Sequence, residues 1–354
     1  MIYNIVKKSV DAGRAGLNQG LPHGFDRLME FVPDIQKSCY YLVGAESSVG
    51  KSAFAYNTFM LNPLDYYLKM KDKMDIKVDI LLYSFEISKD KVFAKAICKD
   101  IYNKHGILLD INYILSRGKN KISDEHYKLV MESAERLEEL SDCIHVRDIP
   151  TNPTGIYMDV INFCKQHGSG IAGDNGCTIG EYVPTHKNHY ILVIIDHISL
   201  ALKERGYNTK EVIDKLSEYM VFLRNKLGVT PIIIQQLNRS LSSADRFKID
   251  RVEPQLSDFK NSGNPIEDAD VVLTLFSPHR YEMPTYRKYD ITKLKDRFRG
   301  LSILKNRDGE SDKNLGLLFI GECGNFSELP KAELMTSENY EAVQSIKKSY
   351  KTID

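Results

Sequence analysis

Short apolar runs rich in β-branched residues recur along the chain, and longer amphipathic stretches separate them. Runs of about four to eight such residues are typical of buried strands, whereas apolar positions three and four apart indicate a helix. The runs predict strands over 39–43, 79–84, 191–196, 230–235, 270–276, 301–305 and 316–320. The amphipathic stretches predict helices over 52–70, 88–105, 123–140, 153–167, 208–227 and 332–348.

Strands and helices alternate in the earlier part of the chain, whereas strands follow one another more closely from residue 270 onward. Alternation favours right-handed crossovers and a parallel sheet that is buried on both faces. The closer spacing favours an antiparallel extension of that sheet. We therefore expect an α/β fold with a mostly parallel, twisted sheet flanked by helices.

Two stretches interrupt this alternation. Residues 1–34 form a lead-in with a short helix expected around 2–16, which packs on its own domain or docks on a neighbouring subunit. Residues 168–189 are rich in glycine and polar residues and predict an exposed loop inserted before the most apolar strand. We expect one large domain over 35–328 and a helical tail over 329–354.

The overall charge is balanced, with 48 basic and 48 acidic residues. No global basic field attracts nucleic acid, so any nucleic-acid site must be a local basic lining that an oligomer repeats. No apolar run approaches the roughly 20 residues that span a bilayer, and the N-terminus lacks a secretory pattern. The six cysteines are scattered, which suits a reducing cytosol. We expect a cytoplasmic protein with no membrane partner.

Residues 45–52 read Ala-Glu-Ser-Ser-Val-Gly-Lys-Ser, between a predicted strand and a predicted helix. This arrangement binds a nucleoside triphosphate, because backbone N–H groups face the phosphates, Lys51 neutralises charge and the Ser52 hydroxyl reaches Mg²⁺. The strict pattern begins with glycine, where this chain has Ala45, and an ordinary surface turn is the alternative. The residues predicted to bind the nucleotide are Ser47, Ser48, Val49, Gly50, Lys51, Ser52 and Ala53.

Two other strands end in polar residues suited to the same crevice. The strand 191–196 ends in Asp196, and ligands of open α/β sheets lie beyond the carboxyl ends of the strands. Asp196 is therefore expected to hold Mg²⁺ together with Ser52, the alternative being a cap of the following turn. The strand 230–235 leads to the pair Gln235 and Gln236, and only one of them can face the crevice.

Glu86 follows the strand 79–84 and suits the orientation of the attacking water during hydrolysis. One helix and one return strand fit between Lys51 and Glu86. We therefore expect Glu86 on a strand adjacent to the phosphate loop. The alternative is an acid that stabilises the N-terminus of the next helix.

These residues and several later motifs resemble the RecA-like motor domain of DnaB-type replicative helicases over roughly residues 17–328. The phosphate loop of that family likewise begins with alanine. The other motifs are Ser84-Phe85-Glu86-Ile87-Ser88, Gln236-Leu237-Asn238-Arg239-Ser240, 256–263, 266–272 and Lys305-Asn306-Arg307-Asp308-Gly309. The segment 196–199 looks more like the helicase half of phage primase-helicases.

The resemblance implies a RecA-like P-loop NTPase core. It further implies an ATP-hydrolysing DNA helicase that uses Mg²⁺, translocates 5′→3′ on single-stranded DNA as a hexameric homo-oligomeric ring and unwinds duplex during replication. A primase and a helicase loader are the implied partners. The family's N-terminal helical domain is not found in this sequence, which favours a motor-only helicase of a phage replisome, acting in the bacterial host cytoplasm.

The resemblance also assigns roles to individual residues. Glu86 would polarise the lytic water, and Gln236 would sense the γ-phosphate. Lys305 and Arg307 would reach into the active site of the next subunit, where positive charge stabilises the transition state. The alternative for this last pair is two solvated basic residues on an edge strand.

A candidate DNA-binding loop follows from the same resemblance. Lys260, Asn261 and Gly263 match the loop that contacts the single-strand backbone in that family. A lysine and backbone N–H groups at a glycine can hold phosphates without reading bases. The alternative is a surface turn with no role in DNA binding.

Other functions and one metal site remain open. A RecA-type recombinase or repair ATPase, a helicase-loader-like ATPase and a non-hydrolysing ring component share parts of the pattern. The inserted stretch also carries candidate zinc ligands, although their spacing matches no standard site: Cys164, His167, Cys177, His186 and His189.

Overall fold

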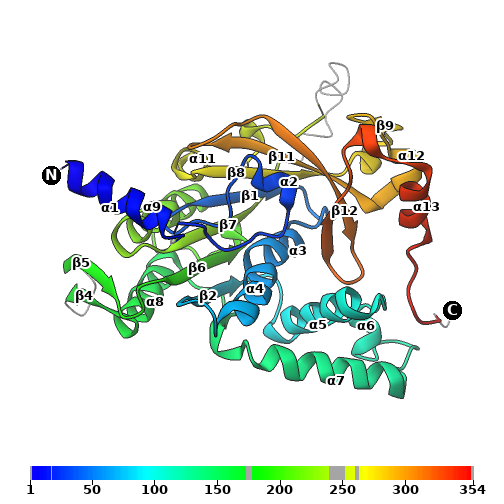
Figure 1. The fold of residues 1–354 in the computed structure, drawn as a ribbon, viewed down its shortest axis with the longest axis horizontal. Coiled ribbons are helices and arrows are strands. Elements are labelled where there is room, and N and C mark those ends of the chain that lie inside the picture. The colour runs from blue at the N-terminus through cyan, green and yellow to red at the C-terminus, as the bar shows by residue number, and fades with distance from the viewer. Residues whose placement is uncertain (1, 17, 173–177, 239–251, 260–262, 352–354) are drawn as a thin grey trace.

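The computed structural model describes residues 2–16, 18–172, 178–238, 252–259 and 263–351. Six parallel strands form most of the central sheet: β1 (Tyr41–Ala45), β2 (Lys77–Ser84), β3 (Ile144–Arg147), β6 (His189–Asp196), β7 (Thr230–Gln236) and β8 (Val271–Phe276). Three antiparallel strands extend it: β11 (Phe298–Asn306), β12 (Lys313–Ile320) and β13 (Asn325–Glu328). The strand order is β13-β12-β11-β8-β1-β7-β6-β2-β3 (Figure 1). The expected parallel sheet with an antiparallel extension is confirmed.

Helices cover this sheet and its edges (Figure 1). Their bounds are α1 (Ile2–Arg14), α2 (Asp26–Met29), α3 (Lys51–Tyr56), α4 (Asn62–Met70), α5 (Lys89–His105), α6 (Ile111–Ile114), α7 (Asp124–Glu138), α8 (Pro153–Gln166), α9 (Thr209–Leu227), α11 (Asn264–Asp268), α12 (Ile291–Leu294) and α13 (Ser337–Ser345). A π-helical segment, 57–61, joins α3 to α4, so the predicted helix 52–70 is continuous but irregular. Within the described residues, no helix is long and apolar enough to cross a membrane.

The core divides between the two faces of the sheet, as strand alternation requires. Tyr41 and Val43 of β1 pack toward α3 and α4, whereas Leu42 packs toward α8 and α9. The six parallel strands are buried at nearly every position. A sheet covered on both faces leaves the carboxyl ends of its strands as the natural place for a ligand.

The lead-in divides into two parts. Helix α1 projects from the body at the N-terminus (Figure 1). Leu21, Phe25 and Leu28, in contrast, are at most 2% exposed and belong to the same hydrophobic cluster as β1. The boundary predicted at residue 34 therefore cuts through a continuous core, and the described residues from Leu21 onward pack with the large domain.

The expectation of an exposed loop over 168–189 is wrong. This stretch forms an antiparallel hairpin of β4 (Gly168–Ala172) and β5 (Thr178–Pro184). Gly168 has a packing role, because a Cβ there would lie 2.4 Å from the ring of Tyr182. The Tyr182 hydroxyl donates to the carbonyl of Cys164 at 3.2 Å. Gly168 therefore permits close packing and is not a sign of irregular structure.

The structure gives no support to the zinc alternative within the residues it describes. No group of three metal-ligating side chains there can hold a metal ion. His189 Nε2 lies 2.7 Å from Asp79 Oδ2, and His186 Nε2 lies 2.9 Å from Asp75 Oδ1. Cys177 lies outside the described residues. Each of these two histidines thus has a carboxylate partner.

Several short elements were not predicted. β3 and β13 are only four residues long, too short for a periodic pattern to mark them. A small hairpin of β9 (Thr285–Tyr286) and β10 (Tyr289–Asp290) precedes β11. The last helix is shorter than the predicted 332–348, because Thr336 caps it by accepting a hydrogen bond from the Asn339 N–H at 3.3 Å.

Candidate nucleotide-binding site

The phosphate loop, residues 46–50, joins the end of β1 to the start of α3. Ser48 and Gly50 have left-handed backbone conformations, with φ of 62° and 105°. Such turns direct backbone N–H groups into one concave space that binds anions. A Cβ at Gly50 would lie 3.0 Å from the ring of Phe319, so both the conformation and the space require glycine. All residues predicted to bind the nucleotide, 47–53, lie in this loop or in the first turn of α3.

Glu86 lies next to the phosphate-binding lysine. Glu86 Oε2 is 3.6 Å from Lys51 Nζ, and the Glu86 side chain is 49% exposed, whereas that of Lys51 is 8% exposed. A half-exposed carboxylate beside a buried lysine can contact both water and a bound triphosphate. This geometry fits the role predicted for Glu86.

The route by which Glu86 reaches the site differs from the prediction. β2 is not adjacent to the phosphate-loop strand, because β7 and β6 lie between β1 and β2. β2 pairs with β6, and the Phe85 N–H continues that pairing by donating to the Asp196 carbonyl at 2.8 Å. The chain beyond β2 therefore runs along the carboxyl ends of the parallel strands to Lys51.

Asp196 ends β6 and is fully buried beside the phosphate loop. Its Oδ2 accepts a hydrogen bond from the Tyr56 hydroxyl at 2.8 Å, while Oδ1 has no hydrogen-bond partner among the described residues. Burial raises the pKa of Asp196, although hydrogen bonding by Ser52 and Tyr56 and the charge of Lys51 oppose this shift. A buried carboxylate oxygen without a donor, close to a serine hydroxyl, fits the oxygen ligands that Mg²⁺ prefers.

The glutamine pair separates as strand alternation predicts. Gln235 is fully buried, whereas Gln236 is partly exposed and lies opposite Ala45 in the β1–β7 register. Gln236 lines a cavity of about 370 Å³ together with Glu46, Ser47, Ser48, Leu237, Arg280 and Tyr281. Gln236 is therefore the member of the pair that faces the phosphate loop.

Lys305 and Arg307 lie at the opposite end of the parallel strands. Lys305 pairs with Val272 near the start of β8, whereas the phosphate loop follows the end of the parallel strand β1. Lys305 Nζ donates to the carbonyls of Ile266 and Glu267 at 2.9 and 2.7 Å. Arg307 Nη1 donates to an oxygen of Asp270 at 2.7 Å. Neither side chain can reach the phosphate loop of its own chain.

The candidate DNA loop lies partly outside the described residues. Lys260 and Asn261 are among those not described, and Gly263 directly precedes α11. The segment before the loop is tied to the end of β7, because the Asn238 N–H donates to the Asp258 carbonyl at 2.7 Å and Leu237 bridges Phe259. The strand that carries Gln236 thus continues directly into the base of this loop.

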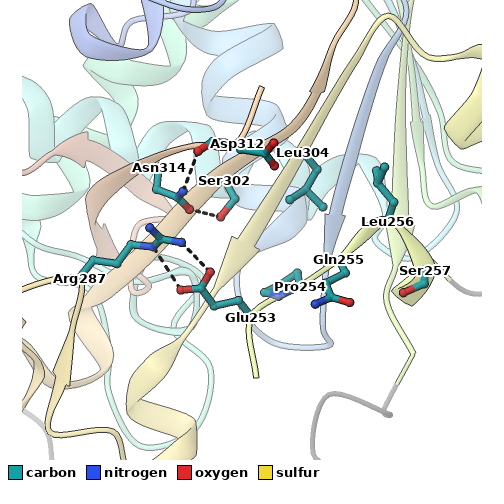
Figure 2. Close-up of a pocket in the computed structure, with 10 residues that line it drawn as sticks. All are labelled: Glu253, Pro254, Gln255, Leu256, Ser257, Arg287, Ser302, Leu304, Asp312 and Asn314. Atoms are coloured by element: carbon teal, nitrogen blue, oxygen red, sulfur yellow. Dashed lines mark hydrogen bonds and ion pairs between the residues drawn. The ribbon is translucent and has the colours of Figure 1, made fainter. Parts of the chain in front are cut away.

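A separate cavity of about 470 Å³ lies beside the same base (Figure 2). Its walls come from residues 253–257 and from β11 and β12. Arg287 Nη2 pairs with Glu253 at 2.7 Å, and Ser302 donates to Asn314 at 2.6 Å. Because these polar groups bond to one another and the cavity lacks the phosphate-loop residues, it is not the nucleotide site.

Sequence reasoning missed several residues of the site. Tyr56 stands four residues after Ser52, a spacing that places both on one helix face and could have indicated it. His197 follows Asp196, and burial together with the Lys51 charge lowers its pKa, so it is neutral at pH 7. Arg280 and Arg299 contact the loop from far along the chain, and no local pattern marks them.

The chain matches known proteins in sequence. The sequence model of the family described as DnaB-like helicase C terminal domain matches residues 183–328. The chain is 24% identical over 325 residues to replicative DNA helicase DnaC of Bacillus subtilis, covering 90% of this chain and 58% of that one. The chain belongs to the DnaB-like helicases. A second relative, replicative DNA helicase DnaB of Geobacillus stearothermophilus, is 23% identical over 322 residues with the same coverage.

Solved structures support the same fold. The DnaB-like chain matches a solved ATPase domain with a TM-score of 0.69 and 20% identity, covering 93% of this chain and 98% of that one. A DnaB-like replicative helicase described with its primase interactions gives a TM-score of 0.63 and 20% identity, with coverage of 88% and 64%. The RecA-like fold is therefore confirmed. The chain spans somewhat more than half the length of the two curated relatives and corresponds to their motor domain.

Proposed function

We propose that this protein is an ATP-dependent replicative DNA helicase motor that works as a ring and travels 5′→3′ on single-stranded DNA. ATP hydrolysis would supply the energy, and strand separation would follow from excluding the complementary strand. The observation that supports this most is the division of the site between the two ends of the parallel strands. Lys51, Glu86 and Asp196 lie at the carboxyl ends, while Lys305 and Arg307 lie at the opposite end.

The chemistry at the carboxyl ends follows from the side chains present. Lys51 neutralises charge on the triphosphate, and Ser52 with Asp196 Oδ1 would hold Mg²⁺, which when bound supplies further positive charge to the phosphates. Glu86 orients the attacking water and accepts its proton. Tyr56 fixes the Asp196 carboxylate through its hydroxyl, so that Oδ1 stays directed at the metal position.

The chemistry at the opposite end requires another copy of the chain. Lys305 and Arg307 would stabilise the transition state at the neighbour's phosphate loop, a contribution on the order of 10³–10⁵ in rate for such a residue. Each interface is then complete only between two protomers, and a closed ring completes all of them. The apolar residues that α1 leaves exposed offer a contact for a neighbour: Ile2, Tyr3, Val6 and Val10.

Coupling to DNA would run along β7. Gln236 faces the phosphate loop, and the backbone contact between Asn238 and Asp258 joins the next residues to the base of the DNA loop. Loss of the γ-phosphate would be sensed by Gln236 and passed to the residues proposed to hold the backbone of the single strand in the channel: Lys260, Asn261 and Gly263.

The partners and location follow from the same proposal. A primase and a helicase loader would act with this motor, in the cytoplasm of a bacterium or of a bacterial host. Because the chain covers 58% of the curated relatives, these properties of the whole protein are proposals.

The test combines turnover with particle imaging. We expect ATP hydrolysis that is stimulated by single-stranded DNA, together with closed six-fold rings, and the hydrolysis should disappear in Lys51→Ala. Helical filaments would instead indicate a recombinase, and small dimers would indicate a loader. Full turnover by a monomer would contradict the proposal.

A further inference from the structure

Two arginines hold the phosphate loop from outside the triphosphate site. Arg299 of β11 is 1% exposed, and its Nε donates to the Val49 carbonyl at 2.7 Å. Arg280, which follows β8, donates through Nη1 to the Ser47 carbonyl at 2.6 Å. Both bonds go to backbone oxygens of the loop, so they constrain its main chain directly.

The buried guanidinium of Arg299 is well supported. Its Nη1 donates to the carbonyls of Asp296 and Phe298, both at 2.7 Å, and its central carbon lies 4.8 Å from the ring centre of Phe319. Burial of a charge is costly unless its donors are satisfied, and an apolar side chain often serves stability equally well. A charged residue at this position therefore calls for an explanation beyond packing.

Peptide geometry supplies that explanation. In a trans peptide the carbonyl and the next N–H point in opposite directions. A carbonyl held by Arg280 at Ser47 turns the Ser48 N–H away from that arginine, and a carbonyl held by Arg299 at Val49 does the same for Gly50. Among the described residues, neither N–H donates to another backbone group.

We propose that Arg299 and Arg280 are positioning residues that keep the Ser48 and Gly50 N–H groups directed at the triphosphate before it binds. Preorganised donors avoid the cost of ordering the loop at the moment of binding. The left-handed conformation of Ser48, which is unfavourable for a residue with a side chain, is held by the same contacts. The inference rests on the proposed function only in that the loop binds a triphosphate.

The test compares Arg299→Met with Arg297→Met. Arg297 lies two residues away and pairs with Glu322 at 2.9 Å, away from the phosphate loop, which makes it a matched control. We expect Arg299→Met to weaken equilibrium binding of a fluorescent ATP analogue by at least about tenfold, the value of one hydrogen bond to a charged group. KM should rise more than kcat falls, and Arg297→Met should bind like the wild type.

Two further variants keep the result decisive. Arg299→Lys retains a charged donor and should recover part of the affinity, which a purely space-filling role would not predict. If Arg299→Met fails to fold, Arg280→Gln at the exposed side of the loop should still weaken binding several-fold. Unchanged affinity in a folded Arg299→Met, or an equal loss in Arg297→Met, would overturn the inference. Unchanged binding in Lys51→Ala would instead overturn the proposed nucleotide site.

Discussion

At the scale of single residues, the site separates charge by burial. Asp196 is fully buried with one oxygen free of donors among the described residues, whereas Glu86 is half-exposed beside Lys51. A buried carboxylate suits a cation, and an exposed one suits contact with water. The two acids therefore have different chemistry although both lie at the carboxyl end of a parallel strand.

Glu86→Gln should separate binding from chemistry. The amide keeps the shape of the side chain but accepts no proton, so turnover should fall by about 10²–10⁴-fold while ATP affinity changes little. Phosphate release and equilibrium binding measure the two effects. Glu46→Gln is the control, because Glu46 bonds to Tyr281 next to the same loop. Turnover of Glu86→Gln within a few-fold of the wild type would exclude the assigned role.

Asp196→Asn should weaken metal binding without unfolding the protein. Burial raises the folded-state pKa of Asp196, so its ionised form is destabilising above that pKa, and the penalty decreases as the pH falls through it. A neutral amide removes the same penalty at neutral pH. We expect an unchanged or higher melting temperature without nucleotide, and a Mg²⁺ requirement raised by at least about tenfold. A lower melting temperature with normal Mg²⁺ dependence would contradict this.

At the scale of elements, local pattern predicted what local sequence determines. The long strands and helices and the strand–loop–helix around Lys51 could be predicted, because periodicity and the Gly-Lys-Ser motif lie in contiguous residues. The β4–β5 hairpin was missed because Gly168 serves the packing of Tyr182 and resembles a loop glycine in sequence. Arg280 and Arg299 were missed because they meet the phosphate loop only through the folding of distant strands.

The link from β7 to the DNA loop gives a prediction of its own. Lys260→Ala should leave basal hydrolysis unchanged, because Lys260 is remote in sequence from every catalytic motif, and should reduce stimulation by single-stranded DNA. The slope of log affinity against log salt should decrease by about one. Lys226→Ala, on the exposed side of α9, is the control. Unaltered stimulation and salt dependence would exclude Lys260 from the DNA contact.

At the scale of the whole molecule, β11 connects the two halves of the catalytic machinery. Arg299 near its start contacts the phosphate loop of its own chain, and Lys305 near its end lies at the opposite end of the sheet with Arg307 just beyond. The chain from Arg299 to Arg307 spans about 26 Å at roughly 3.3 Å per residue. One strand thus joins a protomer's own nucleotide site to the residues proposed to serve its neighbour.

The central claim is that hydrolysis takes place between protomers, and mixing two inactive variants tests it most directly. Glu86→Gln lacks the water-orienting acid, and Arg307→Ala lacks the residue that would act on the neighbour. In a mixed ring, an Arg307→Ala protomer keeps a complete Glu86 site that a Glu86→Gln partner can serve with its intact Arg307. We predict that basal ATP turnover, negligible for each variant alone, appears on mixing. A mixture as inactive as its parents would contradict the account.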